Sequence, residues 1–199
     1  MKCIVGIDEV GRGPLAGPVS VGIVVCKTEL LIPELDDSKK MTEAARLRVY
    51  TIAQRMKREE SITFGVFSSR ASTIDARGIT ESVRRAIARG LAALIPNPAE
   101  ADVFLDGLLS APPEYRQKTI IHGDSLVPVI SLASVIAKVR RDRYMAEVME
   151  KRYSEYGFLR HKGYGTPEHI EALKKFGPSA IHRRSFLRNF SGCGVTLSS

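Results

Sequence analysis

The stretch that decides the fold lies at the start of the chain, where residues 4–13 read IVGIDEVGRG. The residues before the acids are apolar on both alternating faces, which is typical of a central strand covered on two sides. A carboxylate there is costly unless it is paired or binds a metal, and Asp8 and Glu9 are adjacent. The glycines Gly11 and Gly13 allow tight turns or close approach of a ligand. The pattern indicates a metal site beside a phosphate; the alternative is a strand end with solvated acids.

The overall composition is that of a folded protein with a basic surface. The chain has 199 residues, of which 44% are hydrophobic and 26% charged, and these are values of a globular domain with a well-buried core. The net charge of +8 favours a polyanionic partner. Trp is absent and Phe and Tyr are few, which argues against a broad aromatic platform for single strands. We predict one catalytic domain over residues 1–190, with a helical and loop part over 150–190 and a flexible tail over 191–199.

The cysteines and the apolar runs bear on the compartment. Cys3, Cys26 and Cys193 are far apart and lack metal-ligand spacing, so we expect reduced thiols in a cytoplasmic protein. No signal peptide is visible, and the longest apolar run, near residues 19–26, is too short to span a bilayer. We expect no membrane partner.

The spacing of apolar residues predicts strands first and then alternating strands and helices. Strands are expected at residues 3–8, 19–26, 61–67, 103–105 and 119–122. Helices are expected after Thr42, over 79–94, over 129–153 and from 166 to 176, and in the third of these Ile130, Ala133, Ala137, Tyr144 and Val148 should face inward. Early strands without long helical crossovers, followed by βα units, predict an α/β fold with a mixed sheet and helices on its faces.

Two further acids follow predicted strands. Asp106 precedes Gly107, and Asp124 follows Gly123. Because neighbouring strands that end together form sites in α/β sheets, these acids should converge with Asp8 and Glu9. Their repulsion requires cations, and oxygen ligands suit Mg²⁺ or Mn²⁺. Two such ions about 4 Å apart handle phosphodiester hydrolysis. The alternative for each is an ordinary turn or loop acid.

Four blocks of sequence resemble the ribonuclease HII family, and they occur in that family's order. They are residues 6–19 (GIDEVGRGPLAGPV), 37–40 (DSKK), 131–143 (SLASVIAKVRRDR) and 161–166 (HKGYGT). The resemblance implies an RNase H-like fold with a mixed five-stranded sheet. It also implies a metal-dependent endoribonuclease that hydrolyses the RNA strand of RNA–DNA hybrids and cuts on the 5′ side of single ribonucleotides in duplex DNA. The products would carry 3′-hydroxyl and 5′-phosphate ends.

The resemblance also assigns roles to residues. Asp8, Glu9, Asp106 and Asp124 would be the catalytic acids and the ligands of a two-metal Mg²⁺ or Mn²⁺ site. The loop Gly11, Arg12 and Gly13 would sense the ribose 2′-hydroxyl, which separates RNA from DNA. Its backbone groups would be left unpaired by DNA, and Arg12 could pair with a phosphate. Tyr164 would pack on the sugar next to the cut.

Several further residues are candidates for backbone binding. Ser38 and Lys39 match a block expected to grip phosphates, while Lys40 also fits a charge run beside a helix. Lys138 and Arg141 are three residues apart, so both could line the groove from one helix face. We expect structural roles for His161, His169 and His182. The family's usual Asn is replaced by Gly78, which puts a secondary nucleic-acid contact in doubt.

Three other classes of protein fit these residues less well. The ribonuclease HIII family lacks the Gly-Arg-Gly sensor. A non-catalytic nucleic-acid-binding module would gain nothing from clustered negative charge, and a resolvase-like DNA nuclease has no use for a 2′-hydroxyl sensor. We therefore expect a monomeric enzyme without an obligate protein partner, acting on RNA–DNA hybrids and ribonucleotide-containing duplex DNA.

Overall fold

The computed structural model describes residues 2–28, 30, 32, 34–36, 38 and 40–188. The chain forms two compact units. The sheet unit comprises Met1–Val10, Ser20–Ser68 and Val83–Arg140, and the helical unit comprises Gly11–Val19, Ser69–Ser82 and Arg141–Ser199. The expectation of one domain over residues 1–190 stays a prediction, and the expected tail over 191–199 lies outside the described residues.

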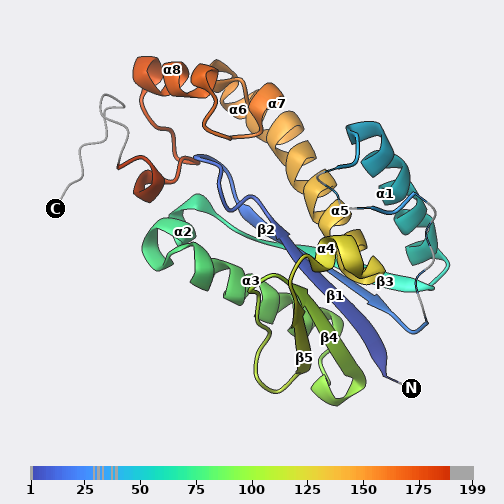
Figure 1. The fold of residues 1–199 in the computed structure, drawn as a ribbon. Coiled ribbons are helices and arrows are strands. Elements are labelled where there is room, and N and C mark those ends of the chain that lie inside the picture. The colour runs from blue at the N-terminus through green and yellow to red at the C-terminus, as the bar shows by residue number, and fades with distance from the viewer. Residues whose placement is uncertain are drawn as a thin grey trace. The chain divides into compact units, whose positions relative to one another are not determined.

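The sheet unit is built on five strands (Figure 1): β1 (Cys3–Val10), β2 (Val19–Cys26), β3 (Ile62–Ser69), β4 (Ala101–Asp106) and β5 (Arg116–Ile120). Their order is β3-β2-β1-β4-β5. Strand β1 runs antiparallel to β2 and parallel to β4, and β4 runs parallel to β5. This arrangement confirms the predicted mixed five-stranded sheet, with β1 at its centre.

Helices cover both faces of this sheet. On one face lie α1 (Glu43–Arg58) and α5 (Pro128–Arg143). Helix α5 lies so close to β1 and β2 that a Cβ at Gly6 or Gly22 would collide with its backbone. On the other face lies α3 (Ile79–Leu94), where a Cβ at Gly90 would collide with Ile23. Glycine is therefore needed at positions 6 and 22, where helix and strand backbones meet.

Local signals in the sequence explain where these elements begin and end. The Thr42 side chain accepts a hydrogen bond from the Ala45 amide and caps α1, as predicted. The short helix α2 (Ala71–Arg77) was not expected. Strand β5 ends at Ile120, earlier than predicted, and His122 after it has a positive φ of 57°.

Within the residues described, no helix combines the length and apolarity needed to cross a bilayer.

The helical unit packs its own apolar core. It contains a π-helical segment (η2, Tyr144–Met149) and α6 (Glu150–Arg152), η3 (Ser154–Tyr156), α7 (Phe158–His161), α8 (Pro167–Phe176) and η4 (Arg184–Phe186). Its buried core residues are Leu15, Ala16, Met145, Met149, Tyr156, Phe158, Leu173 and Leu187. The segment over residues 11–19 thus supplies part of a core that is otherwise formed near the C-terminus.

The predicted long helix over 129–153 is interrupted, and its inward face changes there. Tyr144 and Val148 were expected inside but are 41% and 38% exposed, whereas Met145 and Met149 are 0% and 2% exposed. The cause is the π-helical segment, because bonding from residue i to i+5 accommodates more residues per turn than an α-helix. Positions after Arg143 are therefore rotated relative to a regular helix.

Candidate active site

Three carboxylates converge at one edge of the central sheet. Asp8 on β1, Asp106 at the end of β4 and Asp124 in α4 (Gly123–Leu126) each offer an oxygen, and these atoms lie within 4.8 Å of one another. Asp8 and Asp106 meet because the preceding residues, Ile7 and Leu105, are paired across parallel strands. The Asp124 amide donates to Asp106 Oδ1 at 3.2 Å.

The electrostatics of this cluster favour a cation. Asp8 is only 4% exposed. Its pKa is raised to about 8, by burial first and then by the charges of Glu9 and Asp106, although a hydrogen bond from Ser134 opposes the rise. Without a positive charge the cluster therefore holds a proton at neutral pH. An all-oxygen donor set of this kind fits a hard divalent cation.

Glu9 lies apart from the other three acids. In the β1–β2 pair, Asp8 lies opposite Gly22 and Glu9 lies opposite Val21. Because successive side chains of a strand point to opposite faces, Glu9 belongs to the face away from α5. Its charge still raises the pKa of Asp8. The expectation that Glu9 is a metal ligand stays a prediction.

Serines on helix α5 hydrogen-bond two of the three clustered aspartates. Ser134 on α5 hydrogen-bonds Asp8, and its hydroxyl lies 2.7 Å from that of Ser38. Ser131, one turn earlier, donates to the Asp124 carbonyl at 2.5 Å. Groups that orient metal ligands tune metal affinity. Sequence reasoning missed both helix serines, although their spacing of three places them on one helix face.

The structure places Ser38, a predicted phosphate-binding residue, beside Ser134. Its side chain is only 5% exposed and is paired with Ser134. Ser38 therefore supports Asp8 through Ser134. Lys39 lies outside the described residues. Lys138 is half-buried on α5, four residues after Ser134 and so on the same helix face, and its phosphate contact stays a prediction.

In the helical unit, the loop over residues 11–13 combines one glycine that the fold needs and one that it does not. Gly11 has a φ of +87°, and a Cβ there would collide with the Arg141 side chain. Arg12 and Gly13 are exposed. A Cβ at Gly13 would meet nothing within 4 Å. Packing against the described residues does not explain the second glycine, which leaves room there for a ligand to approach the backbone.

Arg141 is also placed differently from the expectation. Its side chain is fully buried and its guanidinium donates to the carbonyls of Ala16, Pro18 and Lys162 at 3.3, 2.9 and 3.1 Å. Burial lowers its pKa, while Tyr164 and Asp142 oppose that change. Arg141 thus holds the backbone of the helical unit in this structure, and its predicted phosphate contact stays a prediction.

Tyr164 presents an aromatic ring at the surface of the helical unit. The residue is 39% exposed, and its ring centroid lies 5.9 Å from the guanidinium carbon of Arg141. Its amide donates to the His161 carbonyl, and its carbonyl accepts from His169 Nδ1, both at 2.9 Å. The backbone is thus fixed while the ring is accessible. Arg141 contacts both this ring and Gly11 of the loop over residues 11–13.

The three buried histidines pack together, with a hydrogen bond between His169 and His182 and with His161 stacked on His169. Because His169 Nδ1 donates to a carbonyl, its Nε2 accepts from His182 Nε2 at 2.9 Å. His182 Nδ1 in turn accepts from the Ser179 amide. His161 donates to the Tyr156 carbonyl and accepts from the Gly163 amide, and it stacks on His169. All three rings are neutral and satisfied, in agreement with the expected structural role.

A five-stranded mixed sheet of this order, with carboxylates gathered near the ends of adjacent strands, is an RNase H-like fold. Residues 5–189 match the family model of ribonuclease HII. The chain belongs to the ribonuclease HII family and is a ribonuclease H type 2 enzyme.

The chain is similar to curated and solved members of this group. It is 43% identical over 192 residues to ribonuclease HII of Geobacillus thermodenitrificans, covering 96% of this chain and 71% of the relative. It is 45% identical over 186 residues to ribonuclease HII of Geobacillus kaustophilus, covering 94% and 68%. The crystal structure of ribonuclease H2 from Pyrococcus horikoshii matches with a TM-score of 0.74 and 24% identity, covering 92% of this chain and 93% of that one.

Proposed function

We propose that this enzyme hydrolyses the RNA strand of RNA–DNA hybrids and cuts duplex DNA on the 5′ side of a single ribonucleotide, leaving 3′-hydroxyl and 5′-phosphate ends. The observation that carries the proposal is the cluster of Asp8, Asp106 and Asp124, whose oxygens lie within 4.8 Å of one another. These residues, with Glu9, would hold Mg²⁺ or Mn²⁺. A bound pair of such ions supplies charge neutralisation and water activation for phosphodiester hydrolysis.

Different residues of the chain would have different roles in this reaction. The three aspartates would hold the metal ions, and Ser134 hydrogen-bonds the Asp8 carboxylate. The loop over 11–13 would read the ribose 2′-hydroxyl through its backbone, with Gly13 open to a ligand. Tyr164 would pack on the neighbouring sugar. We also propose that the enzyme acts as a monomer in the cytoplasm, without an obligate protein partner.

The decisive experiment is cleavage of a DNA duplex that carries one ribonucleotide, in Mg²⁺, in Mn²⁺ and in chelator. We expect wild type to cut only with a divalent ion. We expect Asp8→Asn to abolish cleavage and nearly preserve substrate binding, because it weakens metal binding and leaves phosphate contacts intact. Asp106→Asn and Asp124→Asn should behave likewise, Asp124→Asn with some residual activity in Mn²⁺.

A matched control comes from the same strand as Asp106. Asp102 on β4 is partly exposed and lies beside Lys2 and Arg116, outside the three-carboxylate cluster. Asp102→Asn should cleave like wild type. A divalent ion should also raise the thermal midpoint of wild type more than that of Asp8→Asn. Cleavage by Asp8→Asn within tenfold of wild type at saturating Mg²⁺ would contradict the assignment.

A further inference from the structure

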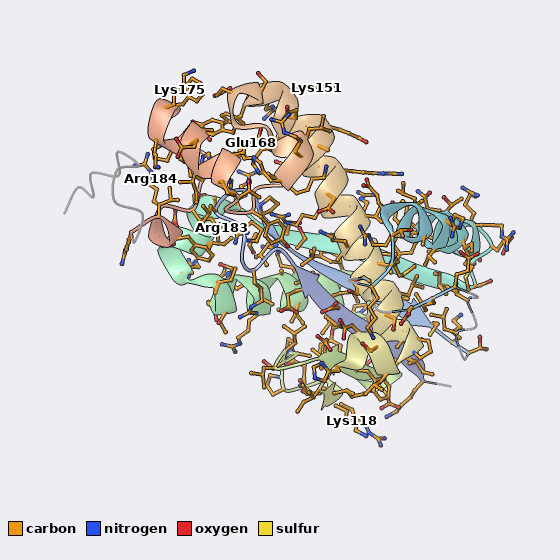
Figure 2. The ribbon with its side chains drawn as sticks, turned by 45° about the horizontal axis from the view of Figure 1, so that its top comes forward. Lys118, Lys151, Glu168, Lys175, Arg183 and Arg184 are labelled. Atoms are coloured by element: carbon orange, nitrogen blue, oxygen red, sulfur yellow. The ribbon has the colours of Figure 1, made fainter. Side chains whose placement is uncertain are left out.

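The helical unit contains a second buried arginine, Arg183, and each of its three side-chain nitrogens donates to the segment that carries the sensor loop, residues 11–13. Its side chain is 0% exposed (labelled in Figure 2). Nε donates to the Gly17 carbonyl at 3.0 Å, and the two terminal nitrogens donate to the carbonyls of Arg12 and Gly11 at 2.8 and 2.6 Å. Two consecutive carbonyls of the sensor loop thus accept from one rigid guanidinium.

These bonds determine where the loop's amides point. The Gly11 carbonyl shares a peptide plane with the Arg12 amide, and the Arg12 carbonyl shares one with the Gly13 amide. In a trans peptide the N–H points away from the C=O. Because both carbonyls face Arg183, the amides of Arg12 and Gly13 point away from it. Both residues are exposed, so these amides are directed to the side that a ligand can reach.

Arg183 is itself held on both sides along the chain. Its own amide donates to the Leu15 carbonyl at 2.8 Å. The Asp75 carboxylate accepts from the next two amides, those of Arg184 and Ser185, at 3.0 Å each. Burial, and then the nearby charge of Arg141, lower the pKa of Arg183 to about 9. The guanidinium therefore stays charged at neutral pH, and its position is set before any ligand arrives.

We propose that Arg183 is a positioning residue for ribose recognition: by holding the Gly11 and Arg12 carbonyls, it aims the Arg12 and Gly13 amides at the 2′-oxygen of the substrate. This inference rests on the proposed function, in which the loop reads that hydroxyl. The 2′-hydroxyl of the nucleotide after the cut takes no part in bond breaking. Changing that group therefore tests recognition alone.

The experiment measures single-turnover cleavage of two duplexes that differ at one nucleotide, a ribose in one and a 2′-fluoro sugar in the other. The readout is the ratio of the two rates, since loss of folded protein lowers both rates equally. Arg183→Lys keeps the charge but loses the paired donors. We expect it to slow ribose cleavage by about 10²-fold and to change 2′-fluoro cleavage by less than threefold, so that the ratio collapses.

A core variant of the same unit provides the matched control. Leu173 is fully buried in the core of the helical unit and donates no side-chain hydrogen bond. Leu173→Ala should lower stability and keep the wild-type ratio. If it lost the ratio as well, general loosening would explain the effect and the proposal would fail.

The remaining outcomes distinguish the proposed function of the loop from the proposed role of Arg183. If the wild-type enzyme cleaves the ribose and 2′-fluoro substrates at the same rate, the proposed function of the loop is wrong. The role of Arg183 then fails with it. A wild type that prefers ribose, together with an Arg183→Lys ratio within threefold of it, would overturn only the role of Arg183. If Arg183→Lys does not fold, Arg183→Gln replaces it. Failure of both to fold would assign Arg183 to the fold itself and overturn the proposal.

Discussion

At the scale of single residues, Tyr164 combines a fixed backbone with an accessible ring. Two buried histidines hold its amide and carbonyl, and the ring is 39% exposed. Such a residue can meet a sugar without a large loss of conformational freedom. Arg141 contacts this ring and Gly11, so the ring and the loop over residues 11–13 share one support.

We expect Tyr164→Ala to lose cleavage at a single ribonucleotide by a large factor, on the order of 10²-fold, with a smaller loss in affinity, because a small misplacement at the cut is costly. Tyr164→Phe should keep part of the activity, since the ring remains. Single-turnover rates of the three proteins decide the matter. An alanine variant as fast as wild type would show that Tyr164 is an ordinary surface tyrosine.

The site residues differ in how far sequence alone could place them. Asp8, Asp106 and Asp124 were predictable to converge, because each follows apolar residues at the end of a predicted strand. The burial of Ser38 and Arg141 was not predictable. Spacing on a helix gives a face, but it does not say which of several packed elements covers that face. Arg183 carried no signal, since its acceptors lie more than 160 residues away in the chain.

At the scale of elements, the three buried histidines connect α7, α8 and the segment before η4. Their hydrogen bonds require neutral rings, and burial is the main cause that lowers the pKa of His169 to about 4 and that of His182 to about 3. In the unfolded chain both rings would bind a proton near pH 6.5. Their contribution to stability is therefore complete above about pH 6.5 and is lost as the pH falls towards their folded pKa values.

We expect the free energy of unfolding to fall by roughly 1–2 kcal/mol per histidine between pH 7.5 and pH 5. Asp8 acts in the opposite sense: its pKa is raised to about 8, so its contribution to stability improves as the pH falls from 8 towards 4. The Asp8→Asn variant removes that opposing contribution. Urea unfolding of this variant at pH 7.5 and pH 5 therefore measures the loss of stability that the histidines cause. Equal stability of this variant at both pH values would contradict the prediction.

The secondary structure was predictable in outline, because strands β1 to β4 and the main helices carry clear periodicity and capping residues. The π-helical segment after Arg143 was not predictable. Its apolar residues fit a continued α-helix equally well, and only the packing of Met145 and Met149 selects the other winding. Helix α2 is only seven residues long, too short to show a period.

At the scale of the whole molecule, the net charge of +8 predicts binding that weakens steeply with salt. If Lys138 neutralises one phosphate, Lys138→Ala should lower the slope of log affinity against log salt by about one unit. Lys57 offers a control, because its Nζ already donates to the Phe64 carbonyl. Fluorescence anisotropy over a salt series measures both variants. An unchanged slope for Lys138→Ala would show that this lysine does not contact the substrate.

The chain passes between the two units at five points, after Val10, Val19, Ser68, Ser82 and Arg140. The helical unit is therefore assembled from three separate segments and does not exist as one continuous peptide. A fragment beginning at Arg141 would lack Leu15 and Ala16, which belong to its core. Recombination at a single breakpoint therefore cannot transfer the whole helical unit from this protein to another scaffold, whereas a tandem domain can be exchanged as one continuous segment.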